Sequence, residues 1–254
     1  MSEVPPPRTR DYLVADMLPY MLRDHVDEND REWNFTVDEA RQLNVDGLPL
    51  LVEHNDGDPD AAGVQLPRIA VGRVEASSVR VPHAKMLASI EPGASSAQAR
   101  AASHAVASGA FKDVSLQHRV SRRASARAGG APVSVKRPTE VSLVGEGWRY
   151  GSRIRDFFPS RATLTRLAVE SPDDLETFID RFGYRPAVID AGVAPASRGA
   201  YIDVLAKASD ERLDKAVAEH RLYSGDVPSP RPWLTCGDGG TQVPATADDN
   251  EHAN

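Results

Sequence analysis

The sequence predicts an α+β fold, with a strand-rich region first and a helical C-terminal third after it. Short runs of branched residues bounded by Gly and Pro, such as Leu48–Glu53, recur before residue 155 and are typical of strands. Later in the chain, Ser171-Pro172-Asp173-Asp174 combines a cap residue, a proline and first-turn acids, as helix starts do. Gly183 stands where a C-terminal glycine would end that helix.

Two helices are expected near the N-terminus. Between Asp11 and Val26, apolar residues recur at helical spacing, and Pro19 is expected to kink or split the run. The capping box Thr36-Val37-Asp38-Glu39 predicts a short helix over Val37–Leu43. Strand character then follows, and the expected strands are Leu48–Glu53, Ile69–Ala76 and Ser78–Val81.

In the second half of the chain, both helices and strands are expected. A helix over residues 94–109, rich in Ala and Ser, would lead into a strand over Lys112–Val120. Further strands are expected at Glu140–Val144 and Tyr150–Ile154, and further helices at Ala200–Lys207 and Asp210–Leu222.

This pattern predicts one folded domain over residues 11–224, between a flexible arm at 1–10 and a polar, disordered tail at 225–254. Residues 121–138 are basic and are expected to form a mobile loop within the domain. That loop is either simply solvated or faces a substrate or partner.

Composition excludes several classes of protein. A net charge of -7 argues against nucleic-acid binding as the main role, so no specific nucleic acid is expected as a partner. The single cysteine, Cys236, excludes an internal disulfide framework and a cysteine-rich zinc site, and no metal or other cofactor is expected. No apolar run reaches membrane-spanning length and no signal peptide is recognisable, so we expect a soluble, intracellular protein with no membrane partner.

Three residues in separate strand-like runs have the chemistry of a serine-protease site. A serine hydroxyl needs a base to take its proton, and that base needs a third group to orient it. His54 ends an apolar strand, Ser115 lies within one, and Glu140 begins another. Taken singly, each is more often a tolerated polar residue. His118 is a poor base for Ser115, because residues three apart on a strand point to opposite faces.

A glycine-flanked turn supplies a further element of such a site. The segment Gly147–Gly151 contains Trp148 and Arg149, and its backbone N–H groups could hold an oxyanion with the Arg149 cation nearby.

At these residues the chain resembles the herpesvirus capsid maturation protease, assemblin. The segment Leu48–Asn55 is similar to its histidine region, Val114-Ser115-Leu116 to its nucleophile strand, and Glu140–Ser152 to its third-residue strand and arginine turn. Assemblin has a second histidine where this chain has Glu140. Tailed-phage prohead proteases, similar in fold, have an acidic residue there, so the chain looks intermediate between the two groups.

The resemblance implies a closed or nearly closed antiparallel β-barrel surrounded by helices. It also implies a serine endopeptidase with His54, Ser115 and Glu140 as the catalytic triad and Trp148 and Arg149 as transition-state stabilisers. The implied substrate is the internal scaffold protein of an assembling procapsid, and self-release from a longer precursor is a second event that the resemblance allows. The implied partners are a second copy of the chain and the capsid shell proteins. The implied location is the procapsid, in the nucleus if herpesvirus-like and in the cytoplasm if phage-like.

Two other interpretations remain open from the sequence. One is a non-catalytic capsid assembly or scaffold-binding protein on the same fold, since folds can keep their shape without their chemistry. The other is an unrelated barrel-type binding module, in which case the three matches arise by chance.

Overall fold

The structure is a computed structural model of the 254-residue chain. It describes residues 8–17, 35, 37–41, 43–53, 69–80, 83–91, 97–123, 133–147 and 152–224. Its elements, in chain order, are β1 (Asp11–Asp16), α1 (Val37–Arg41), β2 (Pro49–Val52), β3 (Gly72–Arg80), β4 (His83–Ile90), α2 (Ala97–Ser108), β5 (Asp113–Arg123), β6 (Val133–Val144), β7 (Arg153–Phe158), α3 (Arg161–Glu170), α4 (Pro172–Arg181), α5 (Arg185–Asp190) and α6 (Arg198–Ser224).

The α+β class is confirmed, but the sheet is open rather than a closed antiparallel barrel. Its seven strands run in the order β5-β6-β2-β3-β4-β1-β7. Neighbours are antiparallel except β2 and β6, which are parallel. The edge strands β5 and β7 approach at one point, where Ile154 N–H donates to the Lys112 carbonyl at 2.8 Å, without pairing along their length. The sheet is therefore a curled half-barrel.

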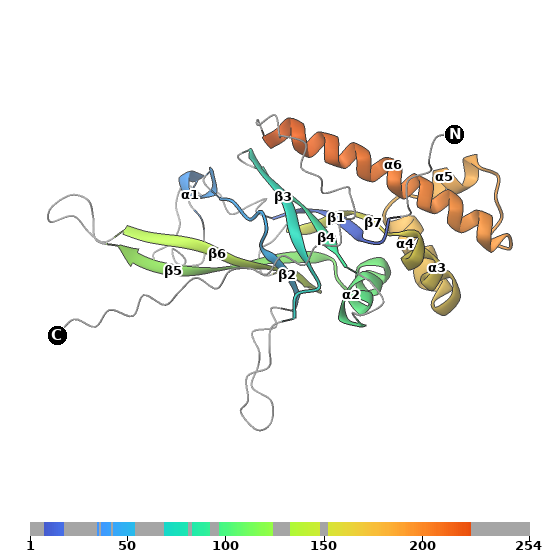
Figure 1. The fold of residues 1–254 in the computed structure, drawn as a ribbon, viewed down its shortest axis with the longest axis horizontal. Coiled ribbons are helices and arrows are strands. Elements are labelled where there is room, and N and C mark those ends of the chain that lie inside the picture. Colours follow the sequence, from blue (N-terminus) through green and yellow to red (C-terminus); the bar gives the residue numbers. More distant parts are fainter. Residues whose placement is uncertain are drawn as a thin grey trace, which may run out of the picture.

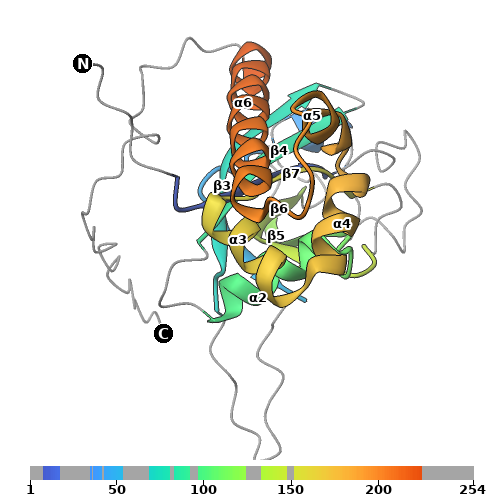
Figure 2. The same ribbon diagram turned by 90° about the vertical axis from the view of Figure 1, so that its right-hand side faces the viewer.

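The helices lie mainly at one end of this sheet. Figure 1 shows α2, α3, α4 and α5 gathered there, while β5 and β6 project together from the other end as a two-stranded ribbon. The same cluster of helices faces the viewer in Figure 2, with α6 rising beside it. The helix α6 has 27 residues and is long enough to reach from this cluster of helices back over the sheet.

Both faces of the β1–β4–β7 part of the sheet are buried. Leu13, Met86 and Phe157 point into the main core, which the curl of the sheet and α2–α5 enclose. The residues that alternate with them pack against α6 in a second cluster formed by Tyr12, Leu87, Phe158, Leu213 and Val217. The long helix thus covers the outer face that the curled sheet would otherwise expose.

The helix expected between Asp11 and Val26 is wrong over its described part, because residues 11–16 form β1. This strand is paired on both sides, with β4 and with β7. Tyr12, Leu13 and Ala15 are all buried, so its apolar residues are continuous rather than alternating. A short continuous run of this kind cannot be distinguished from a helix by periodicity. Residues 18–26 lie outside the described residues.

Other boundaries also differ from those expected. The two strands predicted at Ile69–Ala76 and Ser78–Val81 are one strand, β3, which contains a bulge between Val74 and Ala76. Part of the basic loop expected at 121–138 is strand, since β5 continues to Arg123 and β6 begins at Val133, and residues 124–132 lie outside the described residues. The two C-terminal helices are one continuous helix, α6, and β4, α3 and α5 were not expected at all.

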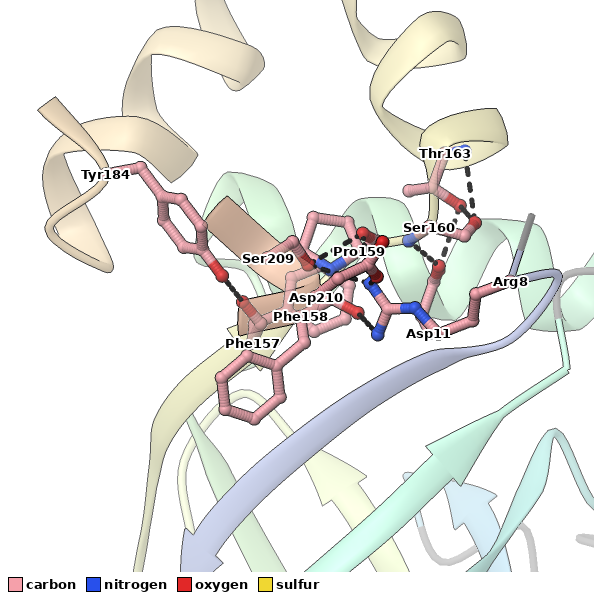
Figure 3. Close-up of polar contacts among 10 residues, drawn as sticks. All are labelled: Arg8, Asp11, Phe157, Phe158, Pro159, Ser160, Thr163, Tyr184, Ser209 and Asp210. Carbon is pink, nitrogen blue, oxygen red and sulfur yellow. Dashed lines mark hydrogen bonds and ion pairs between the residues drawn. The ribbon is translucent and has the colours of Figure 1, made fainter. Parts of the chain in front are cut away.

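Arg8, within the arm expected to be flexible over residues 1–10, is fixed to the helical part of the protein (Figure 3). Arg8 donates hydrogen bonds to the carbonyls of Phe158 and Pro159 and to the Ser209 hydroxyl, and forms an ion pair with Asp210 at 3.0 Å. Ser209 itself donates to the Pro159 carbonyl at 2.9 Å, which satisfies a hydroxyl in the middle of α6. The start of the chain, the β7–α3 connection and α6 meet at this arginine.

Candidate active site

Three neighbouring strands place a row of polar and apolar residues side by side. Ser115 on β5 lies opposite Ser142 on β6, and Ser142 lies beside Leu51 on β2. Glu140 lies opposite Gln117, one pleat further along the same face. The opposite face of these strands carries Val114, Leu116, Val141 and Leu143, which belong to the main core. The sequence therefore folds locally as regular alternating strands, with the polar members turned away from the core.

These polar residues are nevertheless buried. Ser115 is 7% exposed, and Glu140 and Ser142 have no exposed surface. The Ser142 hydroxyl donates a hydrogen bond to the Glu140 carboxylate, with 3.2 Å between Oγ and Oε1. A buried carboxyl group requires such partners, because desolvation without them is costly. No hydrogen bond joins the Ser115 hydroxyl to another described residue.

The end of β2 is held in an unusual conformation. Glu53 has φ of +53°, a left-handed value that is uncommon for a residue other than Gly or Asn. Its N–H donates to the Leu143 carbonyl at 2.9 Å, and its carboxylate accepts from the Gly145 N–H at 3.3 Å. Strained residues of this kind are often found at functional sites. Sequence reasoning missed Glu53, although a charged residue at the end of an apolar strand is a signal for it.

The turn after β6 packs against the start of β5. Gly147 N–H donates to the Asp113 carboxylate at 2.9 Å. A Cβ at Gly147 would meet the Asp113 Cβ at 3.1 Å and the Val114 carbonyl oxygen at 3.4 Å, so the glycine permits this close approach. Asp113 is thus a further site residue that the sequence did not single out.

The structure brings together two of the five residues predicted for the site. Ser115 and Glu140 lie on adjacent strands and on one face of the sheet, separated by two positions of the β5–β6 register. His54, Trp148 and Arg149 lie outside the described residues, so the interactions predicted for them stay predictions. The residues that precede them, Glu53 and Gly147, are described and lie at the same end of the β5–β6–β2 strands.

A different histidine contacts a carboxylate on the helical side of the protein. The His104 Nε2 on α2 lies 2.6 Å from the Asp174 Oδ2 on α4. Both side chains are substantially exposed, and the pair joins two helices. It is not part of the polar row formed by Ser115, Glu140 and Ser142 on the sheet. Within the described residues there is no cluster of three or more His, Cys, Asp or Glu that could hold a metal ion. No helix in the described part of the chain is long and apolar enough to cross a membrane.

No protein-family model matches this chain, and no curated protein matches it. Among solved structures, the chain is similar to the crystal structure of KSHV protease in complex with a hexapeptide phosphonate inhibitor. The sequence identity is 15% and the TM-score is 0.38, over 77% of this chain and 92% of that chain. Because both values are low, this likeness assigns no activity to the chain.

Proposed function

We propose that this protein is a serine endopeptidase that acts in capsid maturation. The observation that carries the proposal is the meeting of three segments at one end of the β5–β6–β2 strands. Glu53 contacts Leu143 and Gly145, Gly147 contacts Asp113, and Ser115 lies opposite Ser142 beside Glu140. The proposed base, the proposed nucleophile, and the proposed carboxylate together with its oxyanion turn come from three parts of the chain that are far apart in sequence, so their meeting supports a common role.

Each residue has a distinct part in the proposed reaction. Ser115 Oγ attacks the scissile carbonyl carbon, and His54 takes the serine proton and later gives it to the leaving amine. Glu140 orients His54 and stabilises the imidazolium that forms. The Trp148 N–H and the Arg149 side chain stabilise the oxyanion. Water then hydrolyses the acyl-enzyme through the same base, which restores the Ser115 hydroxyl.

The proposed substrate is the internal scaffold protein of an assembling procapsid, with cleavage of the chain's own precursor as a second event. In this proposal the enzyme works as a homodimer among capsid shell proteins, inside the procapsid of an infected cell. These assignments rest on the sequence resemblance to assemblin and prohead proteases at His54, Ser115, Glu140 and the arginine turn.

Labelling with a serine-directed peptidyl phosphonate tests the proposed chemistry. We expect one covalent adduct per chain, mapped to Ser115 by peptide mass spectrometry, and none in Ser115→Ala. Ser121→Ala is the matched control, because Ser121 lies on the same strand but is exposed, and its hydroxyl donates to the Val135 carbonyl of β6. A folded, dimeric wild-type chain that forms no adduct at Ser115 would remove the peptidase assignment.

The second candidate is a non-catalytic scaffold-binding or capsid assembly protein. The burial of Ser115 and the Ser142–Glu140 hydrogen bond are the observations that favour it, since both suit a purely structural polar row. The same experiment separates the two functions, because a binding protein would be unmodified by the phosphonate while still associating with scaffold protein.

A further inference from the structure

The β5–β6 ribbon carries a concentration of positive charge that the proposed chemistry does not use. Residues 114–123 of β5 and 133–139 of β6 contain five Lys and Arg residues and no Asp or Glu, although the whole chain has a net charge of -7. This ribbon projects beyond the other strands of the sheet (Figure 1). A local reversal of sign on a projecting element indicates an anionic partner more directly than the average charge of the chain does.

Two of these cations face each other directly. Arg119 on β5 lies opposite Arg137 on β6, and both side chains are exposed. Like charges in this arrangement destabilise a β-ribbon. Among the described residues, neither guanidinium forms an ion pair. An acidic ligand between the two arginines would remove this repulsion.

The opposite face of the ribbon packs against other parts of the protein, so the two faces of the ribbon differ. The His118 ring packs against Phe35, with 4.9 Å between ring centroids, and Phe35 belongs to the main core. Lys136 forms an ion pair with Glu39 of α1 at 2.8 Å, and only 4% of its side chain is exposed. Arg119 and Arg137 therefore lie on the face turned away from the α1 region.

That face is also the face of the candidate active site. On a strand, Ser115, Gln117 and Arg119 point the same way, because successive side chains alternate. Arg119 is the fourth residue after Ser115, which corresponds to about 13 Å along β5. The bulge between Gln117 and His118 places its extra residue on β6, so the alternation along β5 is unbroken.

We propose that the Arg119–Arg137 face of the ribbon binds an acidic segment of a protein substrate and holds it about 13 Å from Ser115. The term substrate rests on the proposed function, whereas the binding itself does not. The guanidinium groups suit carboxylates, since each can bind one with two parallel hydrogen bonds. Single-stranded nucleic acid is disfavoured, because residues 114–139 contain no Phe, Tyr or Trp on which a base could stack.

Fluorescence anisotropy with the full chain tests the proposal at low salt, where surface electrostatics are least screened. The probes are an Asp/Glu-rich peptide, the same peptide with Asn and Gln in place of the acids, and a short DNA duplex. We expect the acidic peptide to bind in preference to the other two. Its affinity is expected to fall about tenfold in the Arg119→Gln/Arg137→Gln double variant.

A charge-matched control is available on α6, where Arg198→Gln/Lys215→Gln removes two exposed cations far from the ribbon. This control is expected to bind the acidic peptide as the wild type does. Equal binding of the acidic and neutral peptides, preferred binding of DNA, or equal losses in the two double variants would each overturn the proposal. The phosphonate experiment is independent of this one. Acidic-peptide binding without an adduct at Ser115 rejects the peptidase function alone, and an adduct without such binding rejects the ribbon site alone.

Discussion

Glu140 has a carboxyl group with no exposed surface, and it accepts a hydrogen bond from the Ser142 hydroxyl. Glu140→Gln tests whether this group orients a base or only fills a polar row. Gln keeps an oxygen that accepts from Ser142, so we expect a folded protein with a nearly unchanged melting temperature. If Glu140 orients His54, the phosphonate reaction is expected to slow by about 10²–10⁴-fold, as the loss of a triad carboxylate does in serine proteases.

The pH profile of the labelling rate separates these roles, because a structural defect would lower the rate without shifting its profile. A rate equal to that of the wild type at every pH would show that Glu140 takes no part in the reaction.

Asp11 is a second buried carboxyl group, and here the pH dependence of folding is the useful measurement. It accepts hydrogen bonds from the Ser160 N–H at 2.6 Å and the Thr163 hydroxyl at 2.9 Å, at the first turn of α3. Burial raises the pKa of Asp11 above its usual value of 3.8, and the hydrogen bonds oppose this change only in part. A raised folded-state pKa contributes stability at pH values below 3.8, and that contribution is lost as pH rises through the folded pKa.

Asp11→Asn removes this titration and keeps an acceptor for the Ser160 N–H. The stability of the variant relative to wild type is therefore expected to improve as pH rises from 3.8 and then to level off above the folded pKa. Urea unfolding at several pH values between about 4 and 8 measures this difference, and each tenfold change in the proton affinity of Asp11 on folding corresponds to about 1.4 kcal/mol. A constant difference across that range, or one that changes in the opposite direction, would contradict the raised pKa.

At the scale of elements, the contact between β3 and β4 depends on a single glycine. A Cβ at Gly72 would lie 1.8 Å from the Ser89 carbonyl oxygen and 2.8 Å from the Ser89 carbonyl carbon, both of which are backbone atoms. Gly72→Ala is expected to destabilise the protein by about 2 kcal/mol or more, because a strand must move to admit the methyl group.

Gly199 on α6 is the matched control, since a Cβ there would meet nothing within 4 Å. Gly199→Ala is expected to stabilise the protein by up to about 1 kcal/mol through its helix propensity. Chemical denaturation of both variants checks the pair. A Gly72→Ala protein as stable as the wild type would mean that the close approach of β3 and β4 is not required.

Elements such as β2, β5, α2, α4 and the second half of β6 could be predicted because their own residues determine them. Branched residues alternate with polar ones along β5 and β6, and α4 has its proline, acids and terminal glycine. The strand β1 could not be predicted, because its apolar residues are buried by partners from distant parts of the chain. The two helices predicted at Ala200–Lys207 and Asp210–Leu222 are likewise one helix, in which the Ser209 hydroxyl is satisfied by the Pro159 carbonyl from outside α6.

In the candidate site, too, some features could be predicted from the sequence and others could not. The chemical types of Ser115 and Glu140 could be recognised in the sequence, and their alternation along the strands was predicted correctly. Their proximity depends on the β5–β6 register, and the position of Glu53 depends on a parallel pairing between strands some 90 residues apart. Such pairings are non-local, so no short stretch of sequence specifies them. The left-handed φ of Glu53 is equally a product of its contacts with Leu143 and Gly145.

At the scale of the whole molecule, Arg8 joins parts of the chain that the sheet alone does not join. Its guanidinium reaches two carbonyls of the β7–α3 connection together with Ser209 and Asp210 of α6 (Figure 3). The side chain is 15% exposed, so these contacts are less screened than those of a surface ion pair. Arg8→Ala is expected to lower the free energy of unfolding by about 2–3 kcal/mol, since it removes three partly buried hydrogen bonds, to Phe158, Pro159 and Ser209.

Arg10→Ala is the matched control, because Arg10 forms ion pairs with Glu75 and Glu91 but is 37% exposed. Its loss is expected to cost about 0.5 kcal/mol. Arg8→Lys should not restore the wild-type stability, because one ammonium cannot reproduce the planar fork that serves carbonyls and carboxylate together. Hydrogen exchange then locates the effect. If the arginine anchors α6, the exchange rates of Arg8→Ala relative to wild type are expected to rise more in α6 than in β5 and β6. An equal rise throughout the protein would show only a general loss of stability.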